Sequence, residues 1–101
     1  MLADIKRARA RPKLGLDWLD RNAALTDANA AVFDAANDFA GCLPGIHEVL
    51  RRQGLLRTTA CLDPHEKLSA GQAAELTRVA RAYPWLVDDA FVAQHRARWL
   101  A

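Results

Sequence analysis

Four prolines divide this chain of 101 residues into segments of helical length. Proline lacks an amide proton and disfavours helical backbone at the residue before it, so a helix ends before a proline or begins with one. The sequence therefore predicts a first helix that ends before Pro12 and a helix that kinks or begins again at Pro44. It also predicts an irregular connection through Pro64 and a helix that ends by Tyr83, because Pro84 follows.

Apolar residues recur at spacings of three and four between these breaks, which is typical of amphipathic helices. No segment shows the alternation of apolar and polar residues that a half-buried strand requires. We therefore expect an all-α fold of about five short helices. The expected inner faces comprise Leu2, Ile5 and Ala8; Leu14, Trp18 and Leu25; Val32, Phe33, Ala36, Phe39, Ala40 and Leu43; Ile46, Val49 and Leu50; Leu76, Val79, Ala80 and Tyr83; and Phe91, Val92, His95, Trp99 and Leu100.

Polar residues and one glycine predict the helix ends more closely. Thr26 is a favourable N-cap and predicts that a third helix begins there, separate from the helix before it. Gly54 suits the left-handed position that follows a helix C-cap. Ser69 followed by Gln72 matches the capping box, and Asp88 is expected to cap the last helix.

Composition limits the class of protein. Hydrophobic residues make up 51% of the chain and charged residues 26%, values ordinary for one small globular domain or for part of a larger one. The two cysteines and the absence of a signal-peptide core favour a soluble, cytoplasmic protein. No run approaches the roughly 18 apolar residues of a membrane helix, so we expect no membrane partner.

Charge gives little support to a nucleic-acid partner. The net charge of +2 comes from 14 basic and 12 acidic side chains that are mostly intermixed. Residues 1–23 form a basic amphipathic N-terminal stretch, but no aromatic residue interleaves its basic cluster, so we interpret that cluster as the solvated side of the first helix. The cluster consists of Lys6, Arg7, Arg9, Arg11 and Lys13.

Carboxylates one turn apart are the first candidate for chemistry. Asp34 and Asp38 have the spacing to bind a metal or to divide acid and base roles, but no histidine completes a ligand set. We expect both to be solvated on the polar face of their helix. The tetrad "HEVL" begins like a zinc-protease helix, yet position 51 is arginine where that motif needs a second histidine.

A looser metal hypothesis uses Cys42 with His47 and Cys61 with His65 as a tetrahedral zinc site. The spacings differ from those of zinc fingers, and free cysteines among apolar neighbours are more often small core residues. There is also no glycine-rich phosphate loop and no GxSxG nucleophile turn. Residue chemistry alone therefore predicts no catalytic, cofactor-binding or metal residue.

A longer string of residues resembles a known family. The runs "TDANAAVFDAANDFAGCLPGIHEVLRRQGLL" and "CLDPHEKLSAGQAAELTRVARAYP" are similar to the C-terminal helical region of the dihydrodipicolinate synthase and N-acetylneuraminate lyase family, particularly its actinobacterial branch. The shared features are a proline-containing helix entry at Pro44, a Gly-Leu stop at Gly54, and a loop with Pro64 and the Leu-Ser pair ending at Ser69. The resemblance covers about residues 24–100.

The resemblance implies a (β/α)8 barrel that condenses or cleaves 2-oxo acids through a Schiff base on a barrel-strand lysine, with a tyrosine that relays protons. Such a barrel needs about 250 residues, so this chain corresponds only to its helical tail. Lys6, Lys13 and Lys67 do not lie in strand-like runs, and Tyr83 lies at a predicted helix end. No catalytic residue of the family is therefore carried over.

Two functions remain open. The first is a C-terminal fragment or remnant of a lyase-family protein, inactive alone, whose apolar helix faces pack on a barrel or at a subunit contact. The second is a stand-alone helical interaction module. The first predicts exposed apolar stripes, and the second predicts a stable monomer or dimer.

Overall fold

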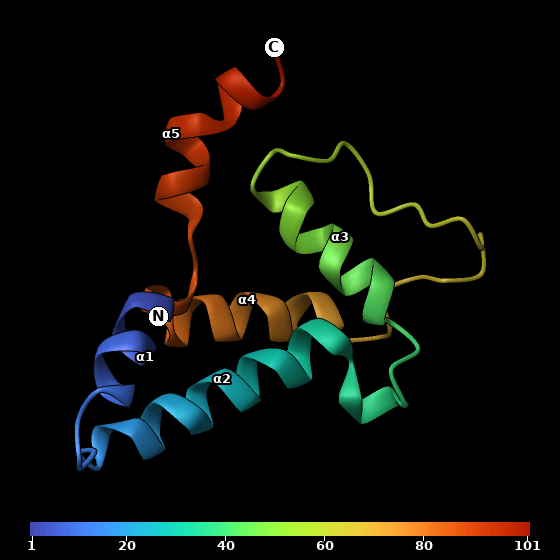
Figure 1. The fold of residues 1–101 in the computed structure, drawn as a ribbon. Helices are drawn as coiled ribbons and strands as arrows, with labels where there is room; N and C mark the ends of the chain where they lie inside the picture. Colours follow the sequence, from blue (N-terminus) through green and yellow to red (C-terminus); the bar gives the residue numbers. More distant parts are fainter.

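The computed structural model describes residues 1–101 and contains only helices and connecting segments (Figure 1). The α-helices are α1 (Leu2–Arg9), α2 (Asp17–Phe33), α3 (Cys42–Arg52), α4 (Gln72–Ala82) and α5 (Asp89–Trp99). Two short 3-10 helices, η1 (Ala35–Asn37) and η2 (Pro84–Leu86), follow α2 and α4. The all-α fold with about five helices is confirmed.

The prolines act at the predicted places. The first helix, α1, ends three residues before Pro12, and α4 ends at Ala82, just ahead of Pro84. Pro44 lies in the first turn of α3 and is fully buried. A first-turn residue has no intrahelical acceptor for its amide, so proline costs no hydrogen bond there. Pro64 lies in the irregular connection between α3 and α4.

The prediction that a separate helix begins at Thr26 is wrong. Thr26 lies in the middle of α2, which runs without interruption from Asp17 to Phe33. A threonine acts as an N-cap only where the chain leaves helical geometry, and the alanine-rich sequence on both sides of Thr26 favours continuation of the helix. The second helix also starts later than Leu14, the first residue of the predicted stretch.

The predicted apolar stripe from Val32 to Leu43 is also wrong, because the helix stops in its middle. The backbone of Asp34 is left-handed, with φ of 59°, and that conformation ends α2. After the break, the side chains of Phe39 and Leu43 are exposed instead of facing a core. Asp and Asn are the non-glycine residues that adopt this backbone most readily.

The core is small and lies where α2, α3 and α4 pack on one another. Its buried centre consists of Ala31, Leu76 and Val79, with partly buried apolar residues around it. In Figure 1, α2 and α4 lie side by side, α3 stands at one end of the pair, and α5 projects away from the body. The radius of gyration is 15.7 Å, against about 13 Å for a compact domain of this length.

The C-terminal end of α3 confirms the predicted glycine stop. Gly54 has φ of 78°, and its amide donates to the carbonyl of Arg51 at 2.9 Å. The amide of Leu55 reaches back to the carbonyl of Leu50, also at 2.9 Å. These two bonds form the Schellman motif, which satisfies carbonyls that would otherwise lack partners.

Replacing Gly54 with valine should destabilise the chain far more than replacing His47 with alanine. A β-branched residue at this φ costs about 1–2 kcal/mol, and its Cβ would overlap the Arg96 side chain. The side chain of His47 makes only long contacts, to the Thr59 carbonyl at 3.3 Å and to Cys61 Sγ at 3.6 Å. Thermal unfolding should show a Tm lower by roughly 5 to 15 °C for Gly54→Val. Equal melting of the two variants would contradict this role of Gly54.

Candidate functional site

The most enclosed polar cluster lies where the end of α2 meets the beginnings of α3 and α4. We call it the polar junction; it consists of Asp34, Asn37, Gly41, Ser69 and Gln72. The Asp34 side chain accepts hydrogen bonds from the Gly41 amide and the Asn37 side-chain amide, both at 2.8 Å, and from the Ser69 hydroxyl. Asp34 is only 4% exposed.

Gln72 completes the polar junction from the α4 side. Its Oε1 accepts a hydrogen bond from the Ser69 amide at 3.0 Å, and its Nε2 donates to the Gly41 carbonyl at 2.9 Å. The first contact has the spacing of the glutamine half of the predicted capping box, but Ser69 is not the N-cap of α4, because the helix begins at Gln72 and its N-cap is Gly71. The other half is absent, because the Ser69 hydroxyl donates to Asp34 instead of accepting from the start of α4.

Two glycines allow the three helix ends to approach so closely. A Cβ at Gly41 would overlap Oε1 of Gln72, and a Cβ at Gly45 would overlap the backbone carbonyl of Val32. The first turn of α3 therefore rests directly on the last turn of α2. Residue spacing does not predict this approach, because it depends on contacts between three different helices.

The structure corrects the prediction for one of the two aspartates. Asp38 is exposed, as expected, but Asp34 is buried. Because α2 ends at Phe33, the two do not share a helix face. Burial acts to raise the pKa of Asp34, but the hydrogen bonds from Ser69, Asn37 and the Gly41 amide outweigh it, and the pKa is lower than usual.

The polar junction leaves no buried side-chain nitrogen or oxygen without a partner. Every buried side-chain nitrogen and oxygen in the chain has a hydrogen-bond partner within the chain. A site that binds substrate keeps donors or acceptors free for it, whereas these groups satisfy one another. The junction is therefore a structural element that fixes the ends of three helices.

Glu48 of the "HEVL" tetrad is part of a second structural cluster. It is 5% exposed and accepts hydrogen bonds from Arg51 Nε at 2.7 Å and from Arg52 Nε at 2.8 Å. The other guanidinium nitrogens of Arg52 donate to Thr77 Oγ1 at 3.0 Å and to the Ala73 carbonyl at 2.9 Å, both on α4. The hydrogen bonds from Arg51 and Arg52 lower the pKa of Glu48 to about 2.

Two of the four residues in the zinc hypothesis lie together. Nδ1 of His47 is 3.6 Å from Sγ of Cys61, and both atoms lie near the Thr59 carbonyl, at 3.3 and 3.5 Å. Cys42 and His65 do not join them, and no three metal-ligating side chains of the chain gather in one place. The tetrahedral set of four ligands is therefore not assembled.

The thiol of Cys61 is not activated as a nucleophile. Partial burial raises its pKa, and the negative charges of Glu66 and Asp63 raise it further. A catalytic cysteine needs the opposite, a lowered pKa that maintains the thiolate. The His47 and Cys61 pair therefore lacks the electrostatics of a nucleophilic dyad.

The residue types of Schiff-base chemistry are also placed unfavourably. Lys6, Lys13 and Lys67 are all exposed, whereas an imine-forming lysine needs an enclosed site. The Tyr83 hydroxyl donates to Asp27 at 2.7 Å, and this bond raises its pKa. Asp27 also accepts both ends of the Arg78 guanidinium, at 2.8 and 2.9 Å, so this group of side chains ties α2 to α4.

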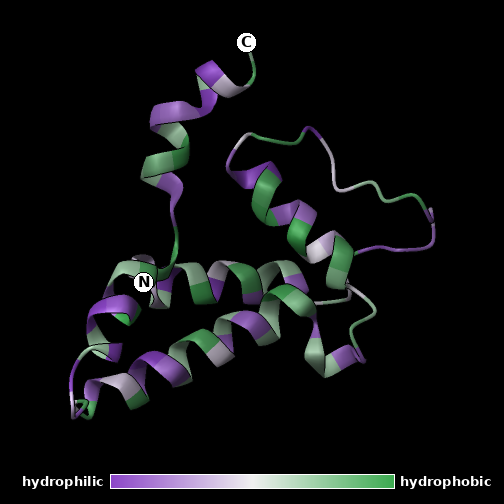
Figure 2. Ribbon diagram, in the orientation of Figure 1, coloured by the Kyte–Doolittle hydropathy of each residue, from purple (hydrophilic) through white to green (hydrophobic).

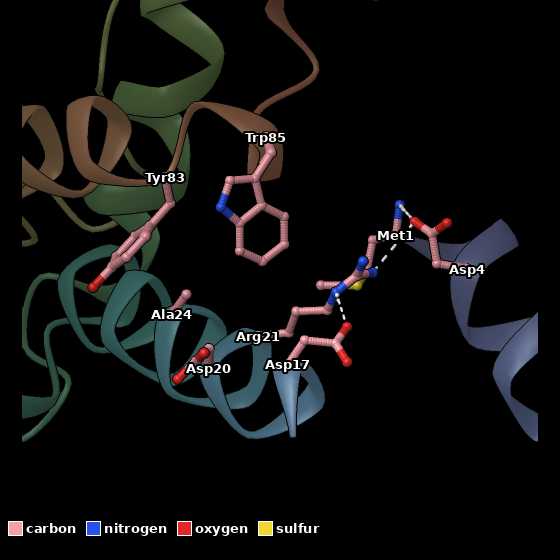
Figure 3. A pocket seen from close by; sticks show the side chains of 8 residues that line it. All are labelled: Met1, Asp4, Asp17, Asp20, Arg21, Ala24, Tyr83 and Trp85. Atoms are coloured by element: carbon pink, nitrogen blue, oxygen red, sulfur yellow. Dashed lines mark ion pairs between the residues drawn. The ribbon is translucent and has the colours of Figure 1, made fainter. Parts of the chain in front are cut away.

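A hollow of about 530 Å³ lies between α1, α2 and η2 (Figure 3). Figure 3 shows the Arg21 side chain between Asp17 and Asp4, with nitrogen to oxygen distances of 3.6 Å to each. The terminal amine of Met1 lies 3.4 Å from Asp4. Charges of the chain itself therefore pair these two carboxylates, and the hollow offers no distinctive site for an external cation.

The exposed surface of the molecule is unusually large for its mass, and it includes many apolar side chains. The accessible surface of 7592 Å² exceeds the roughly 5,700 Å² expected for a folded monomer of 11.1 kDa by about 1,900 Å². Figure 2 shows apolar residues on α5 and along the connection from α3 to α4, both of which extend from the body. Leu62 lies in that connection, and the large exposed apolar side chains elsewhere include Leu14, Leu16, Leu19, Phe39 and Trp85.

The comparisons do not identify a relative. No protein-family model, curated protein or solved structure matches the chain. None of its helices combines the length and the apolar character required to cross a bilayer.

Asp34→Asn should destabilise the chain, whereas Asp38→Asn serves as the matched control. The Asn37 amide, the Gly41 amide and the Ser69 hydroxyl all donate to Asp34. An asparagine side chain would face one of these donors with its own donor nitrogen. At least one buried hydrogen bond is therefore lost, at a cost of about 1 to 3 kcal/mol. Asp38 is exposed, and its replacement should change stability by less than about 0.5 kcal/mol. Urea denaturation measures both, and equal midpoints would show that the polar junction is not stabilising.

Glu48→Gln should change how the free energy of unfolding depends on pH. A carboxylate with a folded pKa of about 2 and an ordinary value of 4.5 stabilises the fold above pH 4.5, and this contribution is lost as the pH falls towards 2. The variant should therefore be less stable than the parent at neutral pH, and the difference should shrink through this window. Denaturation at a series of pH values tests this, and a difference that stays constant would contradict it.

Proposed function

We propose that this chain is the C-terminal helical region of a dihydrodipicolinate synthase and N-acetylneuraminate lyase family protein, inactive alone, that packs its apolar surface on a barrel domain. The string resemblance over about residues 24–100 motivates the proposal. The helix entered through Pro44, its stop at Gly54 and the later helical segment have the order expected of that region. We also propose a cytoplasmic location and no nucleic-acid partner.

The excess of exposed surface is the observation that carries the proposal. An isolated domain normally covers its apolar side chains, but here α1, the start of α2 and the connection between α3 and α4 leave several of them in water. Leu16 is 83% exposed, and Leu62 is fully exposed. An excess of about 1,900 Å² is larger than the roughly 800 Å² that each partner buries in a standard interface.

The placement of the reactive residue types supports the inactive part of the proposal. Schiff-base enzymes hold a lysine in an enclosed pocket, and the three lysines of this chain are on its surface. The strand that carries such a lysine in a barrel has no counterpart here, because the chain contains no strand. The lyase chemistry that the family name implies would therefore belong to a barrel domain.

The alternative is a stand-alone interaction module. The polar junction favours it, because a junction whose buried polar groups are all hydrogen-bonded helps a chain to fold without a partner. The genomic DNA upstream of the Met1 codon distinguishes the two. The proposal expects a barrel-encoding sequence in the same or a shifted frame, and its absence would contradict the proposal.

Incubation with pyruvate and borohydride should leave the mass of the protein unchanged, because no lysine is enclosed for imine formation. Intact-mass spectrometry measures this, and a true barrel enzyme of the family provides the positive control. A covalent adduct at Lys6, Lys13 or Lys67 would show that the chain carries the chemistry itself.

A further inference from the structure

The long connection between α3 and α4 returns to α3 at one point. It covers residues 53–71 and contains no helix (Figure 1). Connections longer than about 12–15 residues without secondary structure are uncommon in compact domains, and many of them have a function. In this one, the Thr59 carbonyl and the Cys61 thiol meet the His47 side chain of α3. All three residues are partly buried.

Three electron-pair donors form a nearly equilateral triangle at this point. Nδ1 of His47 lies 3.6 Å from Sγ of Cys61 and 3.3 Å from the Thr59 carbonyl oxygen, and that oxygen lies 3.5 Å from Sγ. An N–H···O hydrogen bond normally spans about 2.7 to 3.2 Å. Hydrogen bonding therefore accounts poorly for the distance between the imidazole and the carbonyl.

The sides of the triangle match the edges of a tetrahedral zinc site. Zinc binds thiolate sulfur at about 2.3 Å, imidazole nitrogen at about 2.0–2.1 Å and oxygen at about 2.0–2.2 Å. A tetrahedral angle of about 109° then separates sulfur from nitrogen by about 3.5–3.6 Å, nitrogen from oxygen by about 3.3–3.5 Å, and sulfur from oxygen by about 3.5–3.7 Å. The three observed distances of 3.6, 3.3 and 3.5 Å fall within these ranges.

The charges around Cys61 favour a cation beside its sulfur. The negative charges of Glu66 and Asp63 act on the thiol. The same charges that make Cys61 a poor nucleophile would attract a metal ion to it. A hollow of about 560 Å³ beside Cys61, lined also by Thr59, Glu66 and Lys67, provides an entry path for the ion and for a water ligand.

We propose that the Cys61 thiolate, Nδ1 of His47 and the Thr59 carbonyl bind one zinc ion, with water in the fourth position, and that the ion ties the connection to α3. The thiol releases its proton to solvent on binding, and thiolate and imidazole are ligands that zinc prefers. Cys42 and His65, which belong to the set of four suggested by the sequence, take no part. The inference does not depend on barrel packing, because it uses none of the exposed apolar side chains.

Titration of the metal-free full chain with Co²⁺, a coloured substitute for zinc, tests the ligand set. We expect one equivalent to bind with the absorption band of a cobalt–thiolate bond, and Zn²⁺ to displace it. Cys61→Ser should remove the band, and His47→Gln should weaken binding at least about tenfold. Cys42→Ser and His65→Gln are the matched controls and should bind like the parent. Circular dichroism verifies that each variant keeps its helices.

Alkylation by iodoacetamide, followed by mass spectrometry, gives a second readout on the parent chain. One equivalent of Zn²⁺ should slow the modification of Cys61 and leave the rate at Cys42 unchanged. A parent chain that binds no Co²⁺ or Zn²⁺, or a Cys61→Ser variant that keeps the thiolate band, would overturn the proposal. Loss of binding in Cys42→Ser or His65→Gln would overturn this ligand set. None of these results bears on the upstream barrel sequence, so the two proposals fail separately.

Discussion

The buried carboxylate of Asp34 is the interaction on which the body of this molecule depends. It receives hydrogen bonds from an amide seven residues later, at Gly41, and from a hydroxyl thirty-five residues later, at Ser69. It therefore joins the end of α2 to the starts of both other core helices. A buried carboxylate without partners is costly, so these helix ends are stabilised only as a set. The three buried apolar residues of the core would give a weak constraint on their own.

A body fixed at one end explains the open shape of the rest. The polar junction and the Glu48 and Asp27 clusters hold α2, α3 and α4 together, while α1, α5 and the connection between α3 and α4 make few contacts with them. Asp27, Asp34 and Glu48 are the acidic side chains that make these contacts. The exposed apolar side chains are the reason that the proposed function concerns packing against another protein surface.

Sequence reasoning succeeded where the cause is local. Proline excludes helix at Pro12 and permits it in the first turn at Pro44, and glycine is favoured at the left-handed position of Gly54, whatever the rest of the chain does. Sequence reasoning failed where residues far away in the chain determine where a helix ends. The end of α2 at Asp34 depends on hydrogen-bond donors from outside that helix. Thr26 remains helical because no such long-range contact ends the helix there. Ser69 was recognised as part of a capping box, but its hydroxyl takes a long-range partner that spacing does not reveal.

Amide hydrogen exchange of the Gly41 amide, followed by NMR, tests the central role of the polar junction most directly. Its hydrogen bond to Asp34 lies inside the cluster that holds three helices, so the account predicts exchange only through global unfolding, with the same free energy as urea denaturation gives. The amides of α5 should exchange through smaller openings, because that helix is attached by few contacts. Exchange of the Gly41 amide as fast as that of α5 would contradict the account.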